Sequence, residues 1–265
     1  MEALVSPGDE GGLRHKPSAV REVGAGSDTG PTLIRYFAAM SGALGPMHWW
    51  PAKTPFEVIV GAILTQNTSW ANVERAIANL RSAQMLTPRA IAAARFSRLA
   101  MLVRPSGYFR QKAKKLKAFV RFLQREYGGA LKEMFDTPTG ILREKLLAVH
   151  GIGPETADSI LLYAGNHPVF VIDAYTHRIF GRHGITDGKP QYEIVRALFE
   201  AALPLDAHLF NEFHALIVNT GKNWCRKKAP LCAQCPLGHL LPATSPLSQI
   251  RPAVTEANWG VRSAV

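Results

Sequence analysis

Hydrophobic residues recur at intervals of three and four along most of the chain between residues 31 and 241. This spacing places apolar side chains on one face of an α-helix, whereas a half-buried strand would alternate apolar and polar residues. The one strand candidate, Pro168–Ile172, is too short to build a sheet. An all-α fold is therefore predicted. Its helices are expected over residues 33–44, 56–64, 73–80, 116–123, 141–149, 156–163, 175–180, 194–203 and 209–218.

Both ends of the chain lack this periodicity. Residues 1–30 and 242–265 are rich in small and polar residues, which predicts disordered tails. The intervening length suits two lobes with a cleft between them. We expect a six-helix lobe over residues 54–165 and a second helical lobe built from 31–53 plus 166–241.

The composition indicates a globular protein with a polyanionic partner. Of 265 residues, 47% are hydrophobic, and 31 Lys and Arg exceed 20 Asp and Glu, which gives a net charge of +11. Charge alone does not separate nucleic acid from an anionic membrane. No apolar run reaches the roughly 18 residues of a membrane span, and the start of the chain has no apolar signal segment, so a cytoplasmic, nucleoid-associated protein is expected.

Residues 141–165 contain a hairpin signature. The sequence Val149-His-Gly-Ile-Gly-Pro-Glu-Thr-Ala157 ends one predicted helix in a glycine turn and begins another with Pro154. Glycines at positions 151 and 153 permit a close approach, and free N–H groups at a helix start form a phosphate site. An ordinary helix–turn–helix corner is the alternative for this motif taken alone.

The hairpin and the segment after it resemble the helix-hairpin-helix superfamily of base-excision DNA glycosylases, the endonuclease III group. The resemblance extends from residue 31 to 241 and includes Pro168-Val-Phe-Val-Ile-Asp173 and Phe56-Glu-Val-Ile-Val-Gly-Ala-Ile-Leu-Thr-Gln-Asn-Thr68. It implies binding of double-stranded damaged DNA by a monomer, extrusion of one nucleotide, and cleavage of its N-glycosidic bond.

By this resemblance Asp173 is the catalytic carboxylate. It would stabilise positive charge on the sugar and help to activate water. Helix capping is the alternative role for Asp173, and it is compatible with catalysis. Family members that also cleave the strand carry a lysine where this chain has Glu155. Lys189 and Lys222 are poor substitutes, so a monofunctional enzyme without lyase activity is expected.

Aromatic residues near the start of the first lobe suggest a base pocket. Trp49, Trp50 and Trp70 resemble the arrangement in the 3-methyladenine DNA glycosylase III type, where indole rings stack on a cationic base. Ordinary packing is the alternative use of these tryptophans. Gln66 and Asn67 resemble the residues that fill the gap left in the duplex.

A basic segment is a candidate phosphate track. Eight basic residues and no acid lie between Arg104 and Arg125, interleaved with apolar positions. The residues expected to bind DNA are Gly151, Gly153, Thr156, Arg110, Lys112, Lys114 and Lys115.

Three cysteines lie close together in the chain. Cys225, Cys232 and Cys235 have the spacing of the first three ligands of the family's four-cysteine iron–sulfur loop. Leu241 occupies the fourth position, so loss of the [4Fe-4S] cluster is favoured. His239 as a substitute ligand, a partly ligated cluster and a zinc ion stay open. The chemistry itself requires no cofactor.

The leading hypothesis is thus a monofunctional DNA glycosylase of base excision repair that acts on alkylated purines such as 3-methyladenine. The alternatives are an endonuclease III-like glycosylase for oxidised or mismatched pyrimidines and a non-catalytic DNA-binding or damage-sensing module. Asp173 argues against the last of these.

Overall fold

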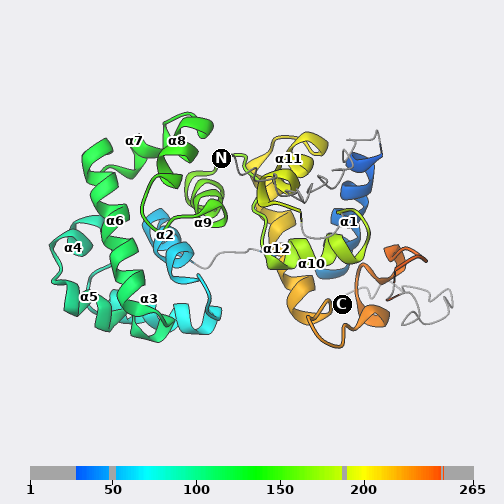
Figure 1. Ribbon diagram of the computed structural model, residues 1–265, viewed down its shortest axis with the longest axis horizontal. Helices are drawn as coiled ribbons and strands as arrows, with labels where there is room; N and C mark the ends of the chain where they lie inside the picture. The colour runs from blue at the N-terminus through cyan, green and yellow to red at the C-terminus, as the bar shows by residue number, and fades with distance from the viewer. Residues whose placement is uncertain (1–27, 48–51, 187–189, 246, 248–265) are drawn as a thin grey trace, which may run out of the picture.

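The computed structural model describes residues 28–47, 52–186, 190–245 and 247. No β-strand occurs among these residues and most of them are helical, which confirms the predicted all-α fold. Figure 1 shows two groups of helices side by side, α2 to α9 in one and α1 with α10 to α12 in the other. Within the described part of the chain, no helix is long and apolar enough to cross a membrane.

The first lobe packs around α2 (Pro55–Leu64). Every residue of α2 after Pro55 is buried, and Thr54 caps the helix by accepting a hydrogen bond from the Glu57 backbone N–H. A helix that is buried all round must be enclosed by others. The helices that pack on α2 are α3 (Trp70–Ser82), α6 (Phe109–Tyr127) and α9 (Pro154–Ser159), which continues into a π-turn at Ile160–Ala164. The outer helices α4 (Pro88–Ala93), α5 (Phe96–Leu102) and α7 (Leu131–Phe135) pack on α6, and α8 (Thr139–Leu147) packs on α9.

The second lobe has an aromatic core. Helices α1 (Thr29–Leu44), α10 (Ala174–Arg182), α11 (Tyr192–Ala202) and α12 (Ala207–Asn223) surround it. Glycine at position 221 lets α12 approach α10 closely, because a Cβ there would lie 2.3 Å from Tyr175 Cδ1. The fully buried rings at the centre are Phe170, Phe180, Phe199, Phe210 and Phe213.

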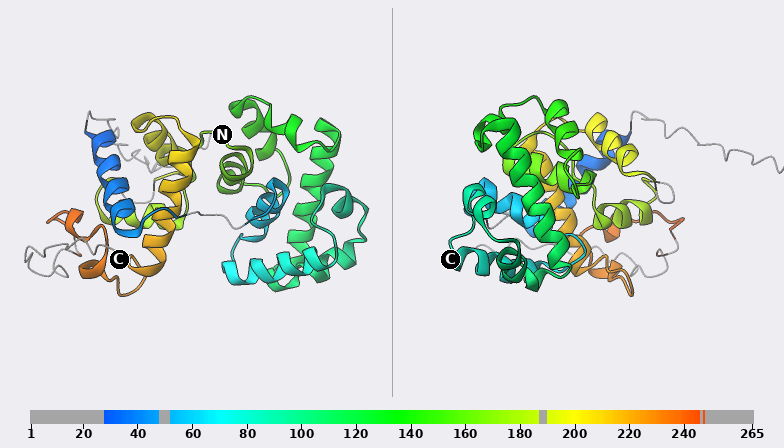
Figure 2. Two further views of the ribbon diagram at one scale, coloured as in Figure 1. Left: turned by 180° about the vertical axis from the view of Figure 1, so that it is seen from behind. Right: turned by 60° about the vertical axis from the view of Figure 1, so that its left-hand side comes forward.

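Figure 2 shows the two lobes from two further sides. A buried ionic cluster joins them. Arg143 of α8 donates two hydrogen bonds to Asp158 of α9, at 2.7 and 3.1 Å. From the second lobe, the Tyr192 hydroxyl donates to Asp158 at 2.8 Å, and Arg196 lies 4.0 Å from the same carboxylate. This cluster fixes α9 against α11.

The structure corrects two predictions about individual segments of the core. Residues 168–172 form no strand: they are an extended, buried segment that leads into α10. Their hydrophobic character therefore reflects burial between helices. Residues 54–165 hold eight α-helices where six were predicted, because α4, α5 and α7 have only 6, 7 and 5 residues, too few to show a hydrophobic period.

The predicted tails also need correction where the structure describes them. Helix α1 begins at Thr29, within the predicted N-terminal tail. Residues 242–245 form a turn that packs on α10, since the Ser245 hydroxyl donates to the Arg182 carbonyl oxygen. Residues 1–27 and 248–265 lie outside the described residues, and the lobe boundaries otherwise stay a prediction.

Candidate active site

The hairpin between α8 and α9 uses its two glycines differently. Gly151 has φ +84°, a conformation that favours glycine, and a Cβ there would lie 2.5 Å from Lys115 Cγ. Gly153 is extended and caps α9. A Cβ at Gly153 would meet nothing within 4 Å, so open space lies in front of it. Of the two glycines, only Gly151 therefore adopts a backbone conformation that favours glycine.

Beneath the hairpin, the side chain of Gln66 is engaged within the protein. Its amide nitrogen donates to the Gly151 carbonyl at 3.1 Å and to the Thr156 hydroxyl at 2.9 Å, and Lys115 donates to its amide oxygen. Thr156 is buried by this contact, so its side chain supports the hairpin and does not face DNA. Asn67 is exposed in a left-handed conformation with φ 53°. The role of Gln66 and Asn67 in filling the duplex gap stays a prediction.

Helix α6 presents a mixed set of the predicted DNA contacts. Arg110 and Lys114 are exposed, and Lys115 is half-buried under Gly151. Lys112 is only 2% exposed and donates to the Ser106 carbonyl at 2.5 Å, while burial lowers its pKa to about 8. The prediction that Lys112 binds DNA is therefore wrong. It lies on the same face of α6 as Leu116, four residues on.

A surface pocket beside the hairpin places two further basic residues next to the basic segment 104–125. It lies between α6 and α8 and is lined by Arg121 and Arg125 of that segment and by Lys145 and His150, among others. Lys145 and His150 come from the hairpin itself, so the pocket extends the positive surface next to the glycines.

We expect Lys114→Ala and Lys112→Met to affect the salt dependence of DNA binding differently. Loss of one phosphate contact should reduce the slope of log K against log salt by about 0.9. Lys114→Ala is expected to show this change and Lys112→Met none, because the Lys112 amine points inward. Fluorescence anisotropy over a salt series measures both slopes. Equal slopes for the two variants would contradict the assignment.

One carboxylate oxygen of Asp173 caps α10, and the other takes no part in the cap. Its Oδ1 accepts hydrogen bonds from the backbone N–H groups of Tyr175 and Thr176, at 2.9 and 2.8 Å, and from the Thr176 hydroxyl at 3.0 Å. The Asp173 side chain is 12% exposed. Oδ2 accepts none of these bonds, so capping leaves this oxygen available for an interaction other than the cap.

His214 and Tyr163 extend this arrangement. His214 Nε2 lies 3.7 Å from Asp173 Oδ2 and has no hydrogen-bond partner among the described residues. Its Nδ1 is hydrogen-bonded to the Tyr163 hydroxyl. Burial lowers the pKa of His214, although the charge of Asp173 opposes this effect. When the Tyr163 hydroxyl donates to Nδ1, the neutral ring carries its proton on Nε2 and presents that N–H to Asp173 Oδ2. Neither residue was predicted from the sequence, because each lies within an apolar helical run.

Glu155 is the second residue of α9. Its side chain reaches the surface, but the surrounding protein removes much of its hydration. This desolvation, together with the negative charge of Asp173, raises the pKa of Glu155 to about 7. The hairpin therefore brings near Asp173 a second carboxyl that exchanges a proton close to neutral pH.

The predicted base pocket is only partly described. Trp70, the first residue of α3, packs against the core of the first lobe and donates from Nε1 to Glu74 at 2.9 Å. Trp49 and Trp50 lie outside the described residues, as does Lys189, while Lys222 is exposed at the end of α12. The stacking role of the three tryptophans stays a prediction.

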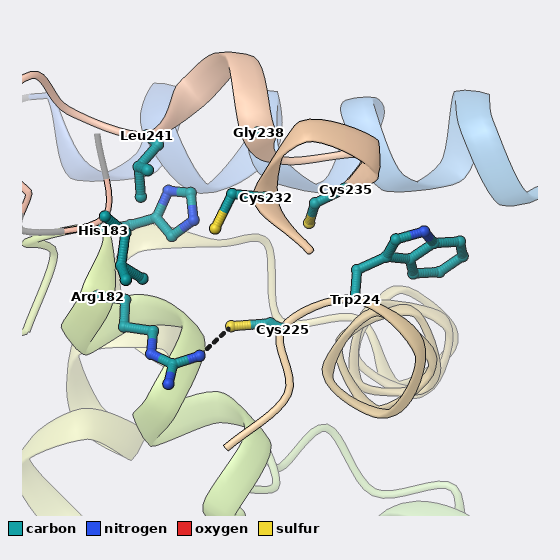
Figure 3. A pocket seen from close by; sticks show the side chains of 9 residues that line it. Arg182, His183, Trp224, Cys225, Cys232, Cys235, Gly238 and Leu241 are labelled. Carbon is teal, nitrogen blue, oxygen red and sulfur yellow. Dashed lines mark hydrogen bonds between the residues drawn. The ribbon is translucent and has the colours of Figure 1, made fainter. Parts of the chain in front are cut away.

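The three cysteines line one pocket, shown in Figure 3. Cys225 follows α12, and Cys232 and Cys235 lie across the pocket from it. Arg182 of α10 donates to Cys225 Sγ at 3.2 Å and to the carbonyl oxygens of residues 226 and 227. The loop is thus anchored to α10 by a guanidinium group.

These residues do not fit a four-thiolate cluster. Leu241, which is 2% exposed, lines the pocket at the fourth ligand position. Among the described residues, no group of three or more His, Cys, Asp and Glu side chains is arranged to hold a metal ion. His239 is exposed and is not a lining residue, whereas His183 is one and also bonds the Tyr36 hydroxyl at 2.9 Å. The metal prediction for these cysteines remains untested.

Several known proteins are similar to this chain over most of its length. A protein of Methanocaldococcus jannaschii, MJ1434, which carries a provisional name as a DNA repair glycosylase, is 49% identical over 73% of this chain and 88% of its own length. Endonuclease III of Thermotoga maritima is 31% identical over 68% of this chain and 79% of its own. The structure of H. pylori 3-methyladenine DNA glycosylase bound to 1,N6-ethenoadenine superposes with a TM-score of 0.62 at 31% identity, covering 74% of this chain and 97% of that one.

The family model for HhH-GPD superfamily base excision DNA repair proteins matches residues 60–205, which include the hairpin, Glu155 and Asp173. The family match and the relatives agree with a site built from the hairpin and Asp173. The chain belongs to the HhH-GPD superfamily of base excision DNA repair proteins and is a DNA repair glycosylase.

Proposed function

We propose that this glycosylase is monofunctional and releases alkylated purines such as 3-methyladenine from double-stranded DNA. The observation that carries the proposal is that Glu155, which lies near Asp173, places a carboxyl group where a lyase would need an amine. The substrate class is supported by the 31% identity to a 3-methyladenine DNA glycosylase over nearly all of that protein.

In the proposed reaction, Asp173 stabilises the positive charge that develops on the sugar as the N-glycosidic bond breaks. An alkylated purine such as 3-methyladenine carries a positive charge in DNA and leaves as a neutral base, so little acid catalysis of its departure is needed. Water completes the reaction at C1′. His214 would hold the free oxygen of Asp173 in place through its Nε2–H.

The protein would bind the lesion strand through the hairpin. Backbone N–H groups around Gly153 would contact phosphate, and exposed Arg110 and Lys114 would follow the backbone. Asn67 would enter the gap left by the flipped nucleotide, and Trp49, Trp50 and Trp70 would surround the extruded base. We propose that the enzyme acts as a monomer and that its chemistry requires no metal.

A second candidate is an endonuclease III-like glycosylase for oxidised or mismatched pyrimidines. The 31% identity to Endonuclease III of Thermotoga maritima favours it. Endonuclease III-like chemistry would not by itself require alkylation of the base, so the choice of lesion separates the two candidates.

Base release from defined lesions tests the proposal. We expect release of methylated purines from methylated duplex DNA, little release from an oxidised-pyrimidine duplex, and no covalent adduct after borohydride reduction. Glu155→Lys supplies an amine as a positive control for trapping. A trapped adduct with the unmodified protein would contradict monofunctionality, preferred release of oxidised pyrimidines would support the second candidate, and no release from any lesion would support a binding module.

A further inference from the structure

We propose that Glu155 is a second catalytic carboxylate, which removes the proton from the water that attacks C1′ while Asp173 stabilises the positive charge on the sugar. This inference rests on the proposed glycosylase function and divides its chemistry between two acidic residues. The structure supports it through the position of Glu155 on α9, the contacts of Asp173, and the electrostatic surroundings of both.

The position of Glu155 follows from how α9 is attached to the segment before Asp173. Asp158 lies one helical turn after Glu155 on the same face of α9. It accepts a hydrogen bond from the Tyr192 hydroxyl at 2.8 Å, and that hydroxyl accepts one from the Ile172 N–H at 3.4 Å. Tyr192 thus ties α9 to the residue before Asp173. Glu155, one turn before Asp158, lies close enough to Asp173 for the charge of Asp173 to raise the pKa of Glu155.

The location relative to DNA favours a role at the sugar. Glu155 is two residues after Gly153, where open space in front of the backbone suits a phosphate. The sugar is the part of a nucleotide bonded to its phosphate, so a side chain next to the phosphate site meets the sugar before the base. An exposed carboxylate at this point can contact a water molecule at C1′.

The two carboxylates have different surroundings. Asp173 Oδ1 accepts three hydrogen bonds, and Asp173 Oδ2 lies 3.7 Å from His214 Nε2. No hydrogen bond of this kind holds the Glu155 carboxylate among the described contacts, and its pKa of about 7 suits proton transfer at neutral pH. The groups that set the local field are Asp173, Tyr192, Asp158 with its partners Arg143 and Arg196, and His214 behind Asp173.

The proposed step balances. The bond between C1′ and the base nitrogen breaks, and its electron pair leaves with the base. The water oxygen forms the new bond to C1′, and its proton passes to the Glu155 carboxylate, which afterwards releases it to solvent. A cationic base leaves neutral, so no further proton donor is needed.

The test is single-turnover release of methylated purines between pH 5 and 9. A base acts in its deprotonated form, so the rate of the unmodified protein should rise about tenfold per pH unit below an inflection near 7 and then level off. Glu155→Gln should reduce the plateau by about 10²- to 10⁴-fold and abolish the inflection. Affinity for lesion DNA should change by less than about threefold, since the backbone of the hairpin is retained.

Two variants complete the test. Glu155→Asp should recover part of the rate together with an inflection, and Glu144→Gln, which removes an exposed carboxylate from α8, should behave like the unmodified protein. If Glu155→Gln keeps both plateau and inflection, or loses only DNA affinity, the inference is overturned. Failure of the proposed function is distinguishable, because the unmodified protein itself would then release no alkylated purine.

Discussion

Asp173→Asn is expected to reduce single-turnover base release by about three orders of magnitude, with the folded structure unchanged. Asn is as good a helix cap as Asp, and its side-chain oxygen can still accept from the N–H groups of Tyr175 and Thr176. What the variant lacks is the negative charge opposite the sugar. The melting temperature and the release rate, measured on the same preparation, separate these two roles.

Asp173→Ala is the matched control for the capping role. It removes both the charge and the cap, so it should lose activity as Asp173→Asn does and also about 1 kcal/mol of stability. If Asp173→Asn released alkylated bases at the rate of the unmodified protein, Asp173 would be only a structural cap. The mechanism proposed for this site would then be wrong.

Local features of the fold were predictable from the sequence. The α-helices of eight or more residues have hydrophobic residues at helical spacing, and the hairpin is marked by Gly151, Gly153 and Pro154 within a few residues. Asp173 follows an apolar segment at a helix start, where both capping and chemistry favour it. These signals depend on neighbours in sequence, which a single chain displays directly.

Contacts between distant residues were not predictable in this way. The bond from Gln66 to Gly151 joins residues 85 positions apart, and Tyr163 meets His214 across 51. No local pattern indicates that an amide or an imidazole will find such a partner. Lys112 differs, because its place on the apolar face of α6, four residues before Leu116, was visible in the sequence.

Charge counting also misled where burial decides the role of a side chain. Lys112 contributes to the positive charge of the segment 104–125 but donates to a carbonyl inside the lobe. Asp158 looks like an ordinary helical acid in the sequence, yet its side chain is fully buried. Its partner Arg143 lies on the other helix of the hairpin, so the pair becomes evident only once the hairpin is folded.

Arg143→Met is expected to destabilise the protein by about 3 to 5 kcal/mol, the largest stability effect that we predict. The variant leaves the Asp158 carboxylate buried without its bidentate partner, retaining only the Tyr192 hydroxyl and the more distant Arg196. Removal of one member of a buried pair costs more than removal of both, because a lone buried charge stays desolvated. Arg143→Met combined with Asp158→Asn should therefore be more stable than Arg143→Met alone.

The pH dependence of this destabilisation has a definite sign. Burial already raises the pKa of Asp158, and Arg143 opposes that effect, so loss of Arg143 raises the pKa further. An acid whose pKa is raised by folding binds its proton more tightly in the native state, so the variant loses stability as pH increases above the unfolded-state value. Urea unfolding at pH 5 and pH 8 should show a larger deficit at pH 8. An equal deficit at both values would mean that Arg143 contributes packing alone, and that the charge of Asp158 is balanced from the second lobe by Arg196.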